Sequence, residues 1–568
     1  MDGPDLGMTG RPAMRRVLGL LALAAVPTAV LAVFFLLPVS GMLQRGLWPE
    51  GSLDLGVLDV LGEERTRKVI WFTLWTSAVS TVVSVVMGLP AAYVLHRLRI
   101  PLRGVVRAAL LVPFVLPTVV VGIAIRQLVG ESGPLGSLGL DGTPVAILMG
   151  LVFFNVAVVI RTVGAAWEAL DRRPAEAAAA LGASPGQVLR TVTLPALRPA
   201  IVSSAVVVFL FCATGFGVVL MLGGTRYSSV ETEIYLLTTG AITGSVEYQA
   251  AAALSLLQIA AVVALLAVAA RLRAVPDPTV RRTRATAARP TRRDLPALLA
   301  TGLVLLAIAT PIATLVTGSL RRDGRWTLEF YRALQGTGED AGGGGIGGGL
   351  LRVPITDALG NSLRIAVDAT WMSLLLGVLV SVVVTRRAHS RAEASVRGVF
   401  DGLFMLPLGV SAVTLGFGFL ITLDDPPLDL RSSPLLVPIA QALVALPLVV
   451  RVLVPVLHGI DDRQRQAAAS LGAGPVRSLL TVEVPVLWRP LLAAAGFAFA
   501  VSLGEFGATS FVVRAQAPTL PVVIYRLIGS PGELNYGTAM AASVVLATTT
   551  ALVILVVERL RVPGVGVL

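Results

Sequence analysis

Few side chains in this 568-residue chain are of the kinds that catalyse reactions or bind metals. Lys68 is the only lysine among 46 basic residues, and no glycine precedes it. Because a nucleotide-binding P-loop needs a Gly-Lys pair, we do not expect the chain to hydrolyse ATP in that way. Cys212 is the only cysteine, which excludes an internal disulfide and a cysteine metal cluster. No metal site is predicted either, because the histidines lie far apart, at His96, His389 and His458.

Four charged residues lie within or at the ends of long apolar runs, where an unpaired charge is costly. Arg364 and Asp368 are four residues apart, a spacing that predicts an ion pair along one helix. Arg126 lies near the end of its run, from which a long side chain can reach water. Glu505 has no such explanation, so it is the best candidate for a functional charge.

Glu505 is flanked by Gly504 and Gly507, which predict a break in the helix. Broken membrane helices commonly line translocation pathways. Because an unpaired carboxylate costs about 2.5–3.5 kcal/mol on insertion scales, Glu505 needs either a wet pathway or a hydrogen bond from a neighbouring helix, and both alternatives stay open. The residues predicted as pathway candidates are Glu505, Phe506, Gly507, Phe216, Gly217 and Asn155.

A short alanine-rich motif has the composition of a sharp bend between two helices. Residues 176–185 read Glu-Ala-Ala-Ala-Ala-Leu-Gly-Ala-Ser-Pro. Alanine favours helix and adds little bulk, and the glycine suits a helix C-terminal cap. The serine can cap the next helix, in which proline fits the first position. The residues that define this motif are Glu176, Ala177, Ala178, Gly182 and Pro195.

The motif recurs 290 residues later, at 466–475, with glutamine in place of glutamate. The same offset pairs Arg161 with Arg451, and Ile234-Tyr235 with Ile524-Tyr525. Agreement of Arg and Ile-Tyr pairs at one offset does not follow from biased composition, so the chain contains an internal repeat. The residues of the second motif are Gln466, Ala467, Ala468, Gly472 and Pro485.

The composition predicts that membrane helices position these motifs. Hydrophobic residues make up 55% of the chain and charged residues only 14%, with a mean hydropathy of +0.82. A soluble chain needs about a quarter of its residues charged, so we predict an all-α integral, multi-pass protein of the cytoplasmic (inner) membrane. Apolar runs long enough to span a bilayer predict twelve helices, at 17–39, 69–95, 108–129, 144–160, 200–222, 250–270, 295–318, 359–384, 402–423, 434–450, 490–512 and 537–557.

The charges between these runs predict the orientation of the chain. If the N-terminus is cytoplasmic and the spans alternate, 31 arginines face the cytoplasm and 13 basic residues face outward. This is the positive-inside pattern, which predicts that both termini are cytoplasmic and both motifs lie on the cytoplasmic side. The net charge of +12 therefore reflects topology. Nucleic acid is not an expected partner, because aromatic residues for base stacking are only 6% of the chain.

The repeat divides the chain into two halves of six spans each. We predict a first half at 1–270, a basic, proline-containing cytoplasmic linker at 271–294 and a second half at 295–568. Six is an even number, so both halves insert in the same direction, as parallel repeats do. The glycine-rich run at 342–349 is predicted to be a flexible external insertion.

The doubled motif resembles the EAA loop of ATP-binding-cassette importer permeases, and two copies in one chain resemble the fused permeases of the thiamine and ferric-iron importers. The resemblance implies the type I importer permease fold, with loops that dock on two copies of a cytoplasmic ATPase. ATP and magnesium would bind to that ATPase, so this chain would itself need no cofactor and be no enzyme. An extracytoplasmic binding protein would deliver the substrate. Gln466 departs from the motif and implies a weaker second contact.

The substrate is suggested by a second set of residues. Gly223-Gly224 with Tyr235, the segment 502–507 and Phe153-Phe154-Asn155 resemble the thiamine permease. Ferric-iron permeases share much of this pattern, so ferric iron is the alternative.

Two other classes of protein fit the sequence less well. A twelve-span transporter driven by an ion gradient would need several acids or histidines within its spans, and only Asp368 and Glu505 qualify. An intramembrane enzyme is disfavoured because no His-Glu-x-x-His motif and no paired catalytic aspartates occur within the spans.

Overall fold

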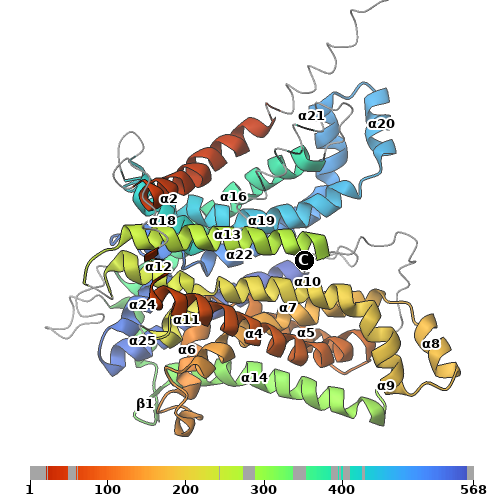
Figure 1. Cartoon of the computed structure of the whole chain (residues 1–568), viewed down its shortest axis with the longest axis horizontal. Helices are drawn as coiled ribbons and strands as arrows, with labels where there is room; N and C mark the ends of the chain where they lie inside the picture. The colour runs from red at the N-terminus through yellow and green to blue at the C-terminus, as the bar shows by residue number, and fades with distance from the viewer. Residues whose placement is uncertain are drawn as a thin grey trace, which may run out of the picture. The chain divides into compact units, whose positions relative to one another are not determined.

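The computed structural model is an assembly of long helices (Figure 1). It describes residues 21, 23–48, 59–60, 62–224, 226–241, 244–272, 288–336, 353–385, 395, 398, 400, 404, 410–424 and 429–559. Within them, ten helices are long and apolar enough to cross a membrane: Leu23–Leu47, Glu64–Arg97, Pro144–Ala169, Pro185–Ala213, Tyr248–Val268, Arg292–Ser319, Ile355–Thr385, Leu436–His458, Leu480–Leu503 and Glu533–Val556. The prediction of a helical membrane protein is confirmed. The predicted number of twelve continuous membrane spans is not confirmed.

In chain order, the two repeats contain the following elements. Those of the first are η1 (Ala32–Leu36), α2 (Leu37–Leu47), α4 (Glu64–Arg97), α5 (Arg103–Val115), α6 (Thr118–Val129), η2 (Gly136–Leu138), α7 (Pro144–Ala169), α8 (Arg173–Ala180), α9 (Pro185–Val188), η3 (Leu189–Thr193), α10 (Leu194–Ala213), α11 (Phe216–Gly223), α12 (Val230–Thr239) and α13 (Tyr248–Leu272). Those of the second are η4 (Arg292–Asp294), α14 (Leu295–Ser319), β1 (Arg321–Arg322), β2 (Arg325–Trp326), α15 (Glu329–Arg332), η5 (Ala333–Gln335), α16 (Ile355–Thr385), α18 (Ala412–Thr422), α19 (Leu436–His458), α20 (Asp462–Ser470), α21 (Pro475–Ser478), η8 (Leu479–Glu483), α22 (Val484–Leu503), α23 (Thr509–Val512), α24 (Leu520–Gly529) and α25 (Glu533–Arg559).

The third predicted span of the first repeat is not a single helix. The predicted span 108–129 is divided into α5 and α6 at Leu116, whose ψ of 136° is extended. Pro117 follows it, and a proline disfavours helical backbone in the residue before it. Of the predicted span 402–423, the structure describes α18 as an eleven-residue helix, and residues 405–409 lie outside the description.

The fifth span of each repeat is also interrupted, at equivalent positions. Helix α10 ends at Ala213 and α22 ends at Leu503, 290 residues apart. Short helices follow both breaks, and the later pair, α12 and α24, has the same length and the same offset. The break that the glycines around Glu505 predicted is therefore present, and the first repeat shares it.

The only strands among the described residues form one small exception to the helical fold. Strands β1 and β2 pair as an antiparallel hairpin directly after α14. The turn between them places Asp323 and Gly324 at φ of 49° and 76°.

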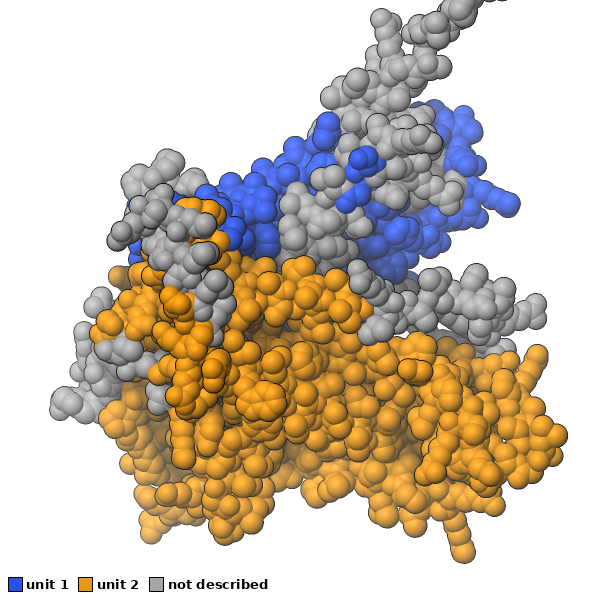
Figure 2. Space-filling model, viewed as in Figure 1, with its two compact units in different colours: residues 1–44, 360–514, 552–568 blue, residues 45–359, 515–551 orange. Residues whose placement is uncertain are grey.

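The chain forms two compact units that do not coincide with the two sequence halves (Figure 2). Unit 1 comprises residues 1–44, 360–514 and 552–568, and unit 2 comprises 45–359 and 515–551. Unit 1 therefore contains α2 from the first repeat, and unit 2 contains α14 from the second. Unit 2 also contains α24 and most of α25 from the second repeat.

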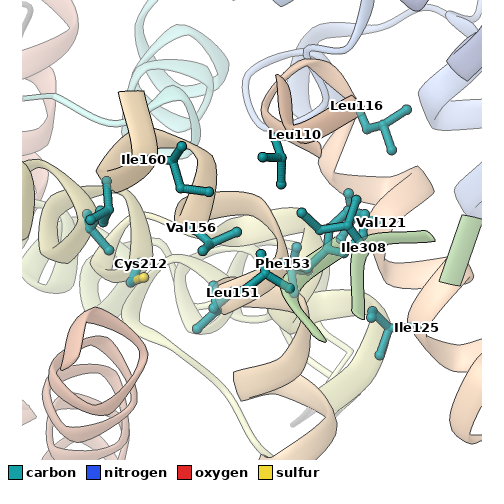
Figure 3. Packing of buried hydrophobic residues seen from close by; sticks show 14 of the residues in the cluster. Leu110, Leu116, Val121, Ile125, Leu151, Phe153, Val156, Ile160, Cys212 and Ile308 are labelled. Carbon is teal, nitrogen blue, oxygen red and sulfur yellow. The ribbon is translucent and has the colours of Figure 1, made fainter. Parts of the chain in front are cut away.

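The core of unit 2 is built from α4, α5, α6, α7, α10, α11 and α14. Figure 3 shows its buried side chains, among them Leu110, Val121, Phe153, Cys212 and Ile308. Ile308 belongs to α14 of the second repeat. In unit 1 the first span of the first repeat contributes in the same way, because Ala24, Leu31 and Phe35 are buried against second-repeat residues including Phe419 and Leu443.

In a lipid bilayer the hydrophobic effect does not drive apolar helices together. Close helix packing therefore depends on small residues at the helix interface. In unit 2, a Cβ added at Gly88 of α4 would lie 2.8 Å from Val159 of α7. In unit 1, a Cβ at Gly377 of α16 would lie 2.4 Å from Val449 of α19. The same contact thus holds the second and fourth spans together in each repeat.

Candidate functional site: two bent loops and two helix breaks

The first alanine-rich motif forms two short helices joined by a tight bend. Helix α8 ends in a Schellman arrangement, in which the Ala183 N–H donates to the Ala178 carbonyl at 3.1 Å and the Gly182 N–H donates to the Ala179 carbonyl at 3.0 Å. Gly182 has a φ of +86°. This left-handed backbone conformation favours glycine, which has no Cβ to clash.

The next helix of the loop, α9, starts with a complete capping box. The Gln187 N–H donates to the Ser184 hydroxyl oxygen at 3.4 Å, and the Ser184 N–H donates to the Gln187 side-chain oxygen at 2.7 Å. Pro185 occupies the first turn, and a π-helical turn, η3, then leads into α10. Pro195 lies in the first turn of α10. Local residue order therefore accounts for the bend.

The second motif forms the same structure. The Ala473 N–H donates to the Ala468 carbonyl and the Gly472 N–H to the Ala469 carbonyl, both at 3.0 Å. Gly472 has a φ of +78°. Helix α21 and the π-helical turn η8 follow, and Pro485 lies in the first turn of α22.

Both bends expose a leucine. The side chains of Leu181 and Leu471, each directly before the bend glycine, are 89% and 87% exposed. Glu176 lies exposed in the first turn of α8, and Gln466 is exposed at the equivalent position of α20. Each loop thus exposes an apolar side chain at its bend.

Polar contacts fix the base of the first loop to the membrane helices in unit 2. The His96 ring nitrogen Nδ1 at the end of α4 lies 2.9 Å from a Glu168 oxygen at the end of α7, and 3.2 Å from an Arg107 nitrogen. The buried Arg97 donates to the carbonyl of Leu170 at 3.2 Å. This cluster could not be predicted from the sequence, because His96 and Glu168 are 72 residues apart.

At the second helix break, the Glu505 carboxylate is buried and accepts hydrogen bonds from its own segment. The Ala508 N–H donates to it at 2.7 Å, the Thr509 N–H donates at 3.0 Å, and the Thr509 hydroxyl also donates. The carboxylate thus caps the start of α23. Gln441 of α19 donates to the Thr509 hydroxyl oxygen at 3.2 Å, which links this network to a neighbouring helix. The first repeat has Gly215 in the equivalent place.

Glycines after the two helix breaks allow their backbone to lie close to a neighbouring helix of the same repeat. In unit 2, a Cβ at Gly217 would lie 2.3 Å from the Thr118 hydroxyl oxygen, next to the break between α5 and α6. In unit 1, a Cβ at Gly507 would lie 3.0 Å from the Cβ of Ala412, at the start of α18. The predicted pathway glycines therefore lie where the fifth span of each repeat meets the start of α6 or α18.

A family model matches both halves of the chain. The model described as "Binding-protein-dependent transport system inner membrane component" matches residues 84–282 and again 373–562, more than half of the chain. The chain belongs to this family. Because the match occurs twice, it is a fused, two-half permease of the inner membrane.

The relatives of this permease cover most of its length. The thiamine transport system permease protein ThiP of Brucella abortus (strain 2308) is 26% identical over 82% of both chains. ThiP of Escherichia coli (strain K12) is 28% identical over 81% of this chain and 83% of its own. A probable ABC transporter permease protein, y4fN of Sinorhizobium fredii, is 26% identical over 96% of this chain and 97% of its own.

The other predicted pathway residues lie in the packed interior of the permease. Asn155 of α7 is 1% exposed, donates to the Leu151 carbonyl at 2.9 Å and lies 3.3 Å from the Cys212 sulfur. Phe216 and Phe506, directly after the two breaks, are 5% and 2% exposed.

The prediction of an Arg364–Asp368 ion pair is wrong. Among the described residues no ion pair joins them, and Asp368 accepts a hydrogen bond from the Trp371 ring at 3.3 Å. Helical spacing allowed the pair, but a closer partner on the same helix competes for the carboxylate. Arg126 lies 3.8 Å from Asp141 and remains 41% exposed, as expected for a side chain that reaches the membrane surface. The described residues contain no group of three His, Cys, Asp or Glu that could hold a metal ion.

Proposed function

We propose that this permease forms the translocation pathway of an ATP-driven importer for thiamine or a similar small cation. The observation that carries the proposal is the extent of the ThiP similarity, which runs through both repeats over 82% of the chain. The residues that resemble thiamine permeases, including Tyr235 and Phe153, lie in the same covered region. Ferric iron, as substrate, is the alternative within the same family.

Uptake by the purified complex distinguishes the two substrates. The permease would be purified with its ATPase, placed in lipid vesicles and supplied with binding protein and ATP. Radiolabelled thiamine is expected to accumulate, and radioactive ferric iron is not. Accumulation of iron alone would favour the alternative. Uptake that continues without ATP but stops with a protonophore would favour a gradient-driven transporter.

We propose that the two bent loops are the contacts with two copies of the ATPase. The tips carry exposed leucines, and the bends are rigid because each is closed by two backbone hydrogen bonds. A rigid knob can transmit the movement of an ATPase subunit to α10 or α22, into which each loop leads. Glu176 adds a charge that Gln466 lacks, so the second contact should depend less on charge.

We also propose that both termini are cytoplasmic and that residues 1–270 and 295–568 are the two permease halves. The 271–294 segment then stays on the cytoplasmic side. In support, Ala288 pairs with Leu98 at the end of α4, beside the base of the first loop. A fluorescent protein fused to the C-terminus should fluoresce, whereas alkaline phosphatase fused there should be inactive.

The pathway is proposed to pass the helix breaks of both repeats. Broken helices commonly surround substrate sites in transporters, and here the breaks carry Phe216, Gly217, Glu505, Phe506 and Gly507. Asn155 lies one helical turn from Leu151, whose side chain would contact a Cβ at Gly215. An extracytoplasmic binding protein is proposed to deliver the substrate to the opposite end from the bent loops.

A further inference from the structure

Two equivalent tyrosines of the repeats contact each other within unit 2. Tyr235 of α12 and Tyr525 of α24 are related by the 290-residue offset. Their ring centroids are 6.3 Å apart, and the rings are nearly perpendicular at 80°. Two positions related by a rotation can touch only if both lie close to the axis of that rotation.

The axis between equivalent repeats is where a shared pathway must run. Substrate sites in transporters built from repeats lie at the interface of those repeats. The tyrosine pair continues inward to a helix break, because the Phe216 ring lies 5.3 Å from the Tyr235 ring. Phe216 is the first residue of α11, directly after the break in the fifth span.

The tyrosine pair lies at the end of unit 2 that is opposite the bent loop. In Figure 1, α12 and α24 are at one end of the long helices, and α8 and α9 are at the other. Helix α10 alone has twenty residues and spans about 30 Å between these ends. If the loops face the cytoplasm, the tyrosines face the binding protein.

The two helices that carry the tyrosines are held in different ways. On α12, the buried Glu233 pairs with Arg65 of α4, and the buried Glu231 accepts a hydrogen bond from Gln258 of α13. The equivalent positions of α24 are Pro521 and Val523, which have no such groups. Polar contacts therefore anchor α12 at two positions whose equivalents in α24 have apolar side chains.

We propose that Tyr235 and Tyr525 form the outer gate of the translocation pathway, closed in this structure, and that α24 moves away from α12 to open it. Both tyrosines are half-buried, so neither is fully enclosed by the protein. The proposal rests on the transport function given above but on no particular substrate. A gate must separate during each cycle, and this distinguishes it from a permanent packing contact.

Reversible cross-linking tests the gate. Tyr235→Cys and Tyr525→Cys would be combined in a Cys212→Ser background, because Cys212 is the only native cysteine. A short bifunctional thiosulfonate reagent should join the two positions in the complex with its ATPase. Thiamine uptake, and ATP hydrolysis stimulated by binding protein, should each fall about tenfold or more and recover with dithiothreitol. The two single-cysteine variants treated identically are the matched controls.

Each outcome bears on the gate independently of the substrate. If the unmodified permease takes up no thiamine, the proposed substrate fails, but the cross-link must still abolish the stimulated ATP hydrolysis. Full hydrolysis or full uptake in a cross-linked sample would overturn the gate, and so would failure of the two positions to cross-link. If the double variant does not insert, Tyr525→Ala should let preloaded solute leak from vesicles without ATP, whereas Tyr525→Phe should not. Equal leak rates would also overturn the gate.

Discussion

Gly182 and Gly472 adopt the same left-handed backbone conformation, with φ of +86° and +78°, at equivalent bends 290 residues apart. No atom lies within 4 Å of a Cβ added at either position. Glycine is therefore required by the backbone and not by local crowding. For other L-residues this conformation is about 1–2 kcal/mol higher in free energy.

The first prediction concerns these bends. Gly182→Asp combined with Gly472→Asp should abolish uptake and co-purification of the ATPase, because it strains each bend and adds charge beside the exposed leucine. Insertion into the membrane should be unchanged, since both positions lie outside the core. Normal transport by the double variant would contradict the coupling role.

Gly186 provides the matched control for the bend variants. It lies in the same loop, four residues after Gly182, and also has open space around an added Cβ, but it does not have a positive φ. Gly186→Ala should therefore keep full uptake. If Gly186→Ala lost as much uptake as the bend variants, the loop would be sensitive to any substitution. The loss in the bend variants could then not be assigned to the bend conformation.

The exposed leucines give a second prediction. Burial of a leucine side chain is worth about 1.5–3 kcal/mol, so Leu181→Ser or Leu471→Ser should weaken ATPase binding about tenfold or more. Leu138→Ser is the control, because Leu138 is 61% exposed but lies in η2, outside both loops. Affinity would be measured by titrating purified ATPase onto the permease in detergent. Unchanged affinity in the Leu181→Ser, Leu471→Ser double variant would contradict docking through the tips.

The third prediction separates the two roles of Glu505. Both carboxylate oxygens accept hydrogen bonds at the start of α23. Glu505→Gln replaces one acceptor with a donor, and Glu505→Ala removes the cap, which typically costs about 1 kcal/mol. A capping role predicts that the melting temperature falls in the order wild type, Gln, Ala, with uptake per folded molecule retained. A pathway charge predicts that Glu505→Gln loses uptake of a cation at an unchanged melting temperature.

The sequence predicted features that depend on near neighbours in the chain. The bends follow from the order Ala-Leu-Gly-Ala-Ser-Pro, because both caps are closed by groups at most five residues apart. The break before Phe506 follows from the glycines around it. The interruption at Pro117 was missed, because proline inside an apolar run is also found in continuous membrane helices.

Relationships between distant segments could not be predicted in the same way. Helix α14 packs on α4 and α6 of the first repeat. Its apolar residues alone do not indicate whether it packs on the first repeat or on its own. The 290-residue offset paired Tyr235 with Tyr525 in sequence, but it did not indicate that they touch. His96 and Glu168 likewise meet only because α4 and α7 pack along their length.

The last prediction concerns Arg65 and Glu233, which anchor α12 to α4. The Arg65 nitrogen Nε lies 2.5 Å from a Glu233 oxygen, and the side chains are 46% and 2% exposed. The arginine can therefore keep its contact with water if its partner is lost, whereas the carboxylate cannot. Arg65→Ala should lower the free energy of unfolding by about 1–3 kcal/mol, because it leaves a buried acceptor unsatisfied. Glu233→Gln should cost about 1 kcal/mol or less.

The double variant Arg65→Ala, Glu233→Gln should be more stable than Arg65→Ala alone, because it no longer buries an unpaired charge. Lys68→Ala is the matched control, since its pair with Glu64 has side chains 73% and 76% exposed, and it should change stability by less than about 0.5 kcal/mol. Thermal melting of the four purified variants in detergent measures all of these differences. A larger loss in Glu233→Gln than in Arg65→Ala would show that the carboxylate is not the buried member that needs its partner, and α12 would then not be anchored by this ion pair.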